Sequence, residues 1–256
     1  MLSIAIITHN EEDNIRDALE SVKWADEIVV VDSCSTDRTQ EMCREYTDKI
    51  YSFEWQGFSE QKNRAISLTT QPWILVLDAD ERVTEELKKE ILNVVKNAYP
   101  STTPLTQEKG AGVNGYYLPR KNYFGERWIK HGGWWPDYTL RLFRRGRGSF
   151  EPREVHEAVK IDGPAAYLKN HLLHYTYKNI GDFSKRMETY SILAAKELFK
   201  KGRRANIFDI IFRPPATFFR MFFIQLGILD GVYGIILAYL YSVYTFNKYW
   251  KLRGMV

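Results

Sequence analysis

The chain has 256 residues, of which 45% are hydrophobic and 27% are charged, a composition typical of a globular protein and not of a disordered one. This length allows one large domain, or one domain with an appendage. The formal net charge of +4 is too small to indicate a nucleic-acid partner. Cys34 and Cys43 have neither metal-ligand nor disulfide spacing, and the first residues show no secretory signal. We therefore expect reduced thiols and a cytoplasmic location.

Short apolar runs alternate with helical periodicity over the first hundred residues. Strands are expected at 2–8, 28–31, 50–51 and 73–77, with helices between them and a further amphipathic helix at 84–97. Strands and helices that alternate at this spacing predict a parallel sheet with right-handed crossovers. The fold class is therefore α/β.

Polar clusters follow three of these strands, beginning at Thr8, Asp32 and Asp78. Because the carboxyl ends of parallel strands share one rim, the three clusters together indicate a nucleotide crevice. The chain has no G-x-G-x-x-G and no P-loop motif, which argues against a dinucleotide enzyme and a P-loop NTPase. Any bound phosphates must then be neutralised by a metal and by basic side chains.

The third cluster contains two carboxylates one residue apart, Asp78 and Asp80. Hard oxygen ligands of this kind favour Mg²⁺ or Mn²⁺. The alternative is purely structural, with Asp80 or Thr84 capping the following helix. Asp32 has a similar alternative role in a turn or helix cap.

Four segments carry a resemblance to a known family, namely residues 6–12, 29–39, 57–66 and 77–81. In order and spacing they resemble glycosyltransferase family 2, and within it the branch of lipopolysaccharide-core β-glucosyltransferases. The resemblance implies a GT-A (Rossmann-like) fold, a mainly parallel sheet flanked by helices. It also implies a nucleotide-sugar donor, expected to be UDP-linked, inversion at the anomeric carbon, and a Mg²⁺ or Mn²⁺ cofactor.

The resemblance also assigns site residues. It places Asp78 at the ribose or sugar of the donor and Asp80 on the metal. Many members carry a second Asp where this chain has Ser33, which points to a difference in base recognition. The other residues assigned to the nucleotide pocket are Thr8, Asn10, Glu11, Asp32 and Lys62.

The segment from 131 to 145 is expected to serve the acceptor side. Its two tryptophans, Trp134 and Trp135, either stack on a sugar or belong to the core. Inverting transfer needs a general base for the acceptor hydroxyl, and positive charge near the leaving diphosphate. By resemblance the base is Asp137, and Arg141 and Arg144 lie beside the diphosphate.

A second group follows that segment. Glu157 is the alternative base, and His156 is expected as a further metal ligand. His171 and His174 are read as structural, with His174 a more remote metal candidate. Arg145 and Arg147 are expected on a solvated edge.

The last part of the chain is rich in aromatic residues and has basic flanks. Its apolar runs are interrupted at 213–215 and at 230–231, so neither reaches the roughly 20 residues that a membrane-spanning helix needs. We expect two interfacial helices that lie on an anionic leaflet. The alternatives are packing on the catalytic domain, a homodimer interface and a spanning hairpin.

Together these expectations define a GT-A catalytic domain at 1–180, with a nucleotide-sugar half at 1–99 and an acceptor half at 115–180. A helical, membrane-associating extension follows at 181–256. The expected activity is inverting, metal-dependent transfer of glucose or a related hexose to a membrane glycolipid. The acceptor would be lipopolysaccharide core or a polyprenyl-linked glycan at the inner face of the cell membrane. The alternatives are a polyprenyl-phosphate sugar transferase and a non-catalytic, membrane-docked nucleotide-sugar-binding protein.

Overall fold

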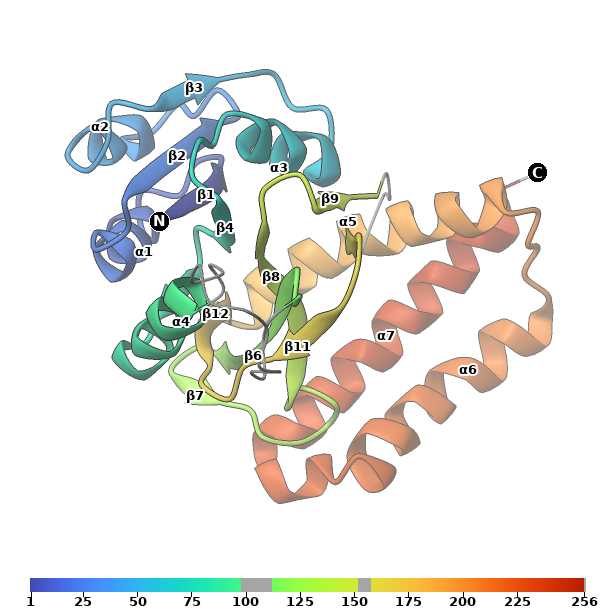
Figure 1. Ribbon diagram of the computed structural model, residues 1–256. Helices are drawn as coiled ribbons and strands as arrows, with labels where there is room; N and C mark the ends of the chain where they lie inside the picture. Colours follow the sequence, from blue (N-terminus) through green and yellow to red (C-terminus); the bar gives the residue numbers. More distant parts are fainter. Residues whose placement is uncertain (98–111, 152–157, 256) are drawn as a thin grey trace. The chain divides into compact units, whose positions relative to one another are not determined.

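The computed structural model describes residues 1–97, 112–151 and 158–255 (Figure 1). The chain divides into two compact units, each described by itself below. The sheet unit comprises the described parts of 1–120, 138–153 and 157–174, and the helical unit those of 121–137, 154–156 and 175–256.

The main sheet has the strand order β3-β2-β1-β4-β8-β6-β12-β5, with β7 and β11 paired to β6. Most of it belongs to the sheet unit, whereas β7 and the last residues of β6 and β12 are counted in the helical unit. The first four strands in this order are parallel, whereas β8 runs antiparallel to β4 and β5 antiparallel to β12. A separate hairpin is formed by β9 and β10. The strands are β1 Leu2–Thr8, β2 Glu27–Asp32, β3 Ile50–Ser52, β4 Trp73–Asp78, β5 Glu81–Val83, β6 Gly115–Phe124, β7 Arg127–Trp128, β8 Asp137–Arg144, β9 Gly148–Phe150, β10 Val159–Ile161, β11 Ala165–Tyr167 and β12 Leu172–Tyr177.

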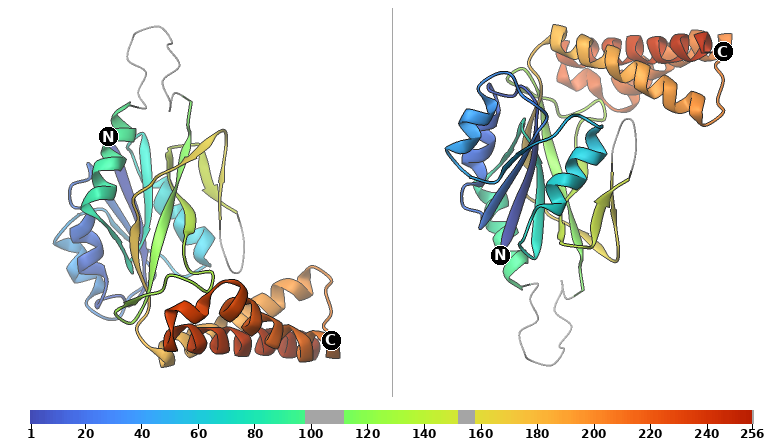
Figure 2. Two further views of the ribbon diagram at one scale, coloured as in Figure 1. Left: turned by 90° about the horizontal axis from the view of Figure 1, so that it is seen from below. Right: turned by 90° about the horizontal axis from the view of Figure 1, so that it is seen from above.

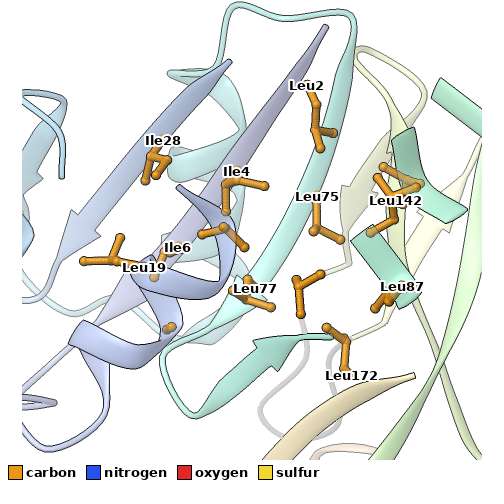
Figure 3. Close-up of a cluster of buried hydrophobic side chains, with 14 of the residues drawn as sticks. Leu2, Ile4, Ile6, Leu19, Ile28, Leu75, Leu77, Leu87, Leu142 and Leu172 are labelled. Carbon is orange, nitrogen blue, oxygen red and sulfur yellow. The ribbon is translucent and has the colours of Figure 1, made fainter. Parts of the chain in front are cut away.

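The central strands are buried on both faces, which explains their continuous apolar sequences. Side chains on one face, such as Ile4 and Leu75, pack against helices α1 and α4 (Figure 3). Side chains on the other face, such as Ala5 and Val76, share a cluster with Ala65 of α3. The helices of this unit are α1 Ile15–Val22, α2 Thr39–Arg44, α3 Phe58–Ser67 and α4 Glu85–Asn97.

The expected strands and helices of the first hundred residues are confirmed, with one addition. Strand β5 lies between Asp80 and α4, where only a turn and a helix cap were expected. The Thr84 hydroxyl does cap α4, since it accepts a hydrogen bond from the Leu87 amide at 3.2 Å.

The strand register brings the polar ends of three strands together. Thr8 of β1 is paired with Asp32 of β2, and Ile7 of β1 with Asp78 of β4. The three predicted clusters therefore begin on adjacent rungs at the carboxyl ends of these strands. Figure 2 shows the strands of the first hundred residues side by side, coloured blue to turquoise.

The helical unit is built on α5 (Ile180–Lys200), α6 (Ile207–Phe219) and α7 (Val232–Gly254). Asn179 caps α5 and Asn206 caps α6 in a reciprocal capping box with Asp209. Helix α7 packs against both other helices. Within the described residues, no helix combines the length and apolar character needed to cross a membrane.

The prolines of this unit do not act as the sequence suggests. Helix α6 runs through Pro214 and Pro215, where a break was expected. It continues into a π-helical turn at Arg220–Ile224, and a 3₁₀ turn at Gly227–Asp230 leads to α7. The expected interruption at 230–231 is confirmed.

Candidate active site

At the end of β4, each carboxylate oxygen of Asp78 has its own cation. Lys62 Nζ of α3 lies 2.9 Å from Oδ1, and Arg141 Nη2 of β8 lies 2.5 Å from Oδ2. The side chains of Lys62 and Arg141 are only 3% and 6% exposed. Burial opposes ionisation of this carboxyl, but Arg141 and Lys62 outweigh it and hold the pKa of Asp78 well below its ordinary value. Asp78 is therefore ionised at neutral pH and is fully engaged by two buried cations.

Glu81, the first residue of β5, adds a second carboxylate to this cluster. Its buried carboxylate lies 2.9 Å from Arg141 Nη2 and 3.3 Å from Arg120 Nη1, and it accepts the Asp78 amide at 3.0 Å. Three cations and two carboxylates leave the cluster of Lys62, Asp78, Glu81, Arg120 and Arg141 with one surplus positive charge. Such a surplus favours an anionic ligand at the rim.

Asp80 faces a different neighbour. Its Oδ2 lies 3.6 Å from Nε2 of His174 in β12, and both side chains are 13% exposed. The turn between the two acids is braced by Arg82, which donates to the Ala79 carbonyl at 2.8 Å. The alternating acids therefore separate into two environments, a cationic one for Asp78 and a carboxylate–imidazole one for Asp80.

The pair of Asp80 and His174 fits a divalent cation in its chemistry. One carboxylate oxygen and one imidazole nitrogen suit Mn²⁺. Mg²⁺ and Mn²⁺ commonly take the rest of their coordination shell from phosphate oxygens and water. Across 1–97, 112–151 and 158–255, no three His, Cys, Asp or Glu side chains are grouped so as to hold a metal on their own. The predicted ligand His156 and the alternative base Glu157 lie outside the described residues.

The predicted nucleotide residues lie at the neighbouring strand ends. Asn10 has a positive φ of 53°, and its Oδ1 accepts the Thr36 amide at 2.8 Å. The Glu11 amide donates to Thr39 at 2.8 Å. These contacts tie the loop after β1 to the loop after β2 and to the first residue of α2.

Asp32 is buried and accepts hydrogen bonds from two residues. They come from the amide and hydroxyl of Ser35, at 2.8 and 2.5 Å, and from Nε2 of Gln40 at 2.7 Å. This geometry corresponds to the alternative role of Asp32 in a turn or helix cap. Asp32 therefore shapes the loop that follows β2.

Two buried oxygens beside these loops have no protein partner. Within the described part of the chain, Thr8 Oγ1 and Gln61 Oε1 make no hydrogen bond. Gln61 meanwhile donates through Nε2 to the Ser33 hydroxyl at 3.0 Å. Ser33, which stands where many family members carry an Asp, is thus supported by a glutamine of α3. A ligand with N–H or O–H donors would satisfy such oxygens.

The structure brings Arg141 to the site but not Arg144. In the antiparallel register of β8 and β4, Arg144 is paired with Trp73, at the opposite end of β4 from Asp78. Its guanidinium lies 4.9 Å from the Trp73 ring centre and donates to the Val113 carbonyl at 3.2 Å. Five residue steps along the strand, roughly 17 Å, separate the two ends.

Asp137 belongs to the helical unit. Asn122 Nδ2 donates to its Oδ2 at 3.0 Å and also to the Trp134 carbonyl at 3.0 Å. Trp134 is a core residue of that unit, whereas Trp135 meets Trp128 edge to face with ring centres 5.6 Å apart. The core interpretation therefore holds for Trp134.

Three contributors were missed or undervalued from the sequence. Glu81 stands next to Asp80 in the fourth motif, but its burial between two arginines is a tertiary feature. Arg120 carries no local signal. The sequence favours a structural role for His174. It lies near Asp80 only because β12 pairs with β5, and this pairing joins segments that are far apart in sequence.

Fold and site together define an α/β protein with an anion-attracting rim beside a candidate cation position. The model for Glycosyl transferase family 2 matches residues 3–156. The chain belongs to this glycosyltransferase family, which confirms the resemblance and, with the mostly parallel sheet and its flanking helices, the predicted GT-A fold class.

Individual relatives extend over nearly the whole chain. The lipopolysaccharide core biosynthesis glycosyltransferase LpsC of Rhizobium meliloti is 30% identical over 252 residues, covering 96% of this chain and 89% of that protein. An uncharacterized glycosyltransferase of Rickettsia conorii is 28% identical, covering 98% and 89%. The crystal structure of S. aureus TarS 1-349 in complex with UDP is similar at 16% identity and a TM-score of 0.48, covering 99% of this chain and 90% of that one.

Proposed function

We propose that this glycosyltransferase transfers a hexose, glucose or a close relative, from a UDP-linked donor with inversion. The observation that carries the proposal is the divided acid pair, in which Asp78 is held by Lys62 and Arg141 while Asp80 lies beside His174. Asp78 therefore holds two buried cations in place, whereas Asp80 and His174 offer ligand atoms for a metal cation.

In this proposal each group has a distinct part in the reaction. Asp78 fixes the ammonium of Lys62 and the guanidinium of Arg141 at the rim, where they would bind the diphosphate of the donor. Preorganised cations stabilise negative charge that develops on a leaving group. Asp80 and His174 would hold Mg²⁺ or Mn²⁺, which when bound supplies further Lewis-acid stabilisation to that diphosphate.

The acceptor hydroxyl must lose a proton as its oxygen attacks. We assign this step to Asp137, whose carboxylate is oriented by Asn122. Its proton acceptance would be concerted with attack, which is the usual behaviour of a general base. Thr8, Asn10, Glu11 and Asp32 would shape the nucleoside end of the pocket, with Asp32 acting through the loop that it organises.

The acceptor proposed is a membrane glycolipid of the lipopolysaccharide-core type, met at the cytoplasmic face of the cell membrane. Support comes from the similarity to LpsC and from large apolar side chains exposed on α6 and α7, such as Phe208, Phe212 and Tyr239 at 65%, 59% and 62%. Exposed apolar surface of this kind marks interaction sites. We propose 1–180 as the catalytic domain and 181–256 as the membrane-associating extension.

A thermal-shift screen of nucleotide sugars with Mn²⁺ tests the donor. The proposal expects stabilisation by one UDP-sugar, with a smaller shift for the same compound without metal. Equal shifts for UDP-, GDP- and CDP-sugars would contradict the assignment of uracil as the nucleobase of the donor.

A further inference from the structure

A groove of about 580 Å³ opens on the helical unit, lined by α6, the π-helical turn, α7 and the segment 132–134. Three basic side chains line it, Arg213, Arg220 and Lys248, and the described residues of its lining include no acid. None of its lining residues belongs to the cluster at the end of β4, and no step of the proposed transfer uses the groove.

The basic side chains of this groove repel one another. Burial, together with the charges of Arg213 and Arg220, lowers the pKa of Lys248. Arg213 is paired with Asp209 at 2.5 Å. Arg220 and Lys248 have no carboxylate partner among the described residues. Lys248 instead lies 4.9 Å from the Tyr249 ring centre. Unneutralised cations that are held together in this way favour a bound anion.

One wall of the groove is fixed in place by hydrogen bonds. The Gly132 amide donates to the Gln225 carbonyl at 2.8 Å, and the His131 amide donates to buried Asp230 at 2.8 Å. Gly133 has a φ of +83°, and a Cβ there would lie 2.9 Å from the Gln225 amide. The backbone conformation at 133 therefore favours glycine, and the hydrogen bonds to Gln225 and Asp230 hold this wall in place.

The turn that carries Arg220 also exposes large apolar side chains. Phe219, Phe223 and Ile224 are 55%, 47% and 68% exposed. Arg220 opens a π-helical turn, a rare geometry that occurs often at functional sites. A cationic groove that adjoins exposed aromatic side chains has the two features of an interfacial lipid site, polar attraction and apolar insertion.

We propose that this groove binds the phosphate group of an anionic membrane phospholipid. Arg220 and Lys248 contact the phosphate oxygens, and Phe219 and Phe223 enter the acyl boundary. The guanidinium can donate two parallel hydrogen bonds to one phosphate. The exposed apolar residues select a lipid over a free anion. This inference rests on the membrane association proposed above and specifies which residues carry it.

The test uses the full chain and vesicles of phosphatidylcholine with and without phosphatidylglycerol, with binding measured by co-sedimentation. The groove variant is Arg220→Gln/Lys248→Gln. The control is Lys185→Gln/Lys196→Gln on α5, which removes the same charge from exposed positions outside the groove. We expect the groove variant to lose roughly tenfold or more in affinity for the anionic vesicles, and the control to lose about twofold or less.

Equal losses in the two variants would mean diffuse charge attraction and would overturn the inference, as would no loss in either. Inorganic phosphate that binds the wild-type groove as tightly as vesicles do would also overturn it, by assigning the groove to a free anion. A vesicle-independent dimer that the groove variant abolishes would assign it to a second copy of the chain.

Two further measurements separate this inference from the proposed catalysis. Thermal unfolding of the groove variant should match or exceed that of wild type, because removing Lys248 relieves like-charge repulsion. UDP-sugar turnover is measured on the same proteins in detergent. Groove-dependent vesicle binding supports the inference even where turnover fails, and turnover without groove-dependent binding overturns it.

Discussion

The Arg141 guanidinium lies 2.5 Å from Oδ2 of Asp78 and 2.9 Å from Oε1 of Glu81. One buried cation therefore joins the last residue of β4 to the first residue of β5. Arg141 therefore bridges the two ends of the short turn that contains Asp80, and the Asp80 carboxylate lies 3.6 Å from His174 instead.

Replacing Arg141 by Gln should lower transfer strongly. The change leaves the buried Glu81 and the partly buried Asp78 with less compensation, and breaking a buried pair costs about 3–5 kcal/mol of folding stability. It also removes a cation from the proposed diphosphate site, for which we expect a roughly 10²- to 10³-fold loss in kcat. Chemical denaturation and steady-state kinetics check the two effects separately.

Arg145→Gln is the matched control, because Arg145 is exposed on the same segment. It should change stability by less than about 0.5 kcal/mol. If both substitutions reduced kcat equally, the special position of Arg141 would be refuted.

Substitution of His174 by Gln should weaken Mn²⁺ binding in the presence of UDP. Loss of one of two protein ligands is expected to cost roughly 10- to 100-fold in metal affinity. Isothermal titration calorimetry with Mn²⁺ measures this directly. His171→Gln, three residues earlier on the chain, is the control and should retain wild-type affinity. Unchanged affinity in the His174 variant would remove it from the metal site.

The Asp137→Asn variant tests the general base. For a hydroxyl acceptor we expect kcat to fall by roughly 10²- to 10⁴-fold with little change in donor binding. A phosphate acceptor needs no strong base, so a small effect would favour the polyprenyl-phosphate alternative. Comparing kcat with the affinity for UDP distinguishes the loss of a base from a loss of binding.

Glu27 gives a prediction about acid stability. Its nearly buried carboxylate accepts the Thr70 amide at 2.7 Å and the Thr70 hydroxyl at 2.9 Å, and it also contacts Lys49 and Ser3. Burial alone would raise the pKa of Glu27, but the hydrogen bonds to Lys49, Ser3 and Thr70 lower it from 4.5 to about 2. Because the folded-state pKa is depressed, this stabilisation is present above pH 4.5 and is lost as the pH falls towards 2.

We therefore expect Glu27→Gln to reduce stability by about 1–3 kcal/mol at neutral pH and to flatten the decline between pH 4.5 and 2. Urea unfolding across this range measures both. An unchanged acid slope in the variant would show that other carboxyls control it.

The sequence predicted the first four strands because their apolar runs are local signals. The same pattern placed Thr8, Asp32 and Asp78 on one rim, which the register confirms. It could not place Arg141 against Asp78 and Arg144 away from it, because the two differ only through the antiparallel pairing of β8 with β4.

Two other features could not be predicted from the sequence, the partners of the acidic motif and the course of α6. Glu81 and His174 meet their partners through β5 and β12, whose pairing joins distant segments. Pro214 lies within α6 although proline usually ends a helix. There the Ser242 hydroxyl of α7 donates to its carbonyl at 2.8 Å, a contact that no local rule supplies.

The most direct test of the account is release of UDP from a panel of UDP-hexoses by the purified chain with Mn²⁺, for wild type and Asp80→Asn. We predict turnover of one donor by wild type, abolished by chelation and reduced at least about 100-fold in the variant. Turnover by the variant equal to wild type, or tight metal-dependent donor binding by wild type with no turnover of any donor, would contradict the account.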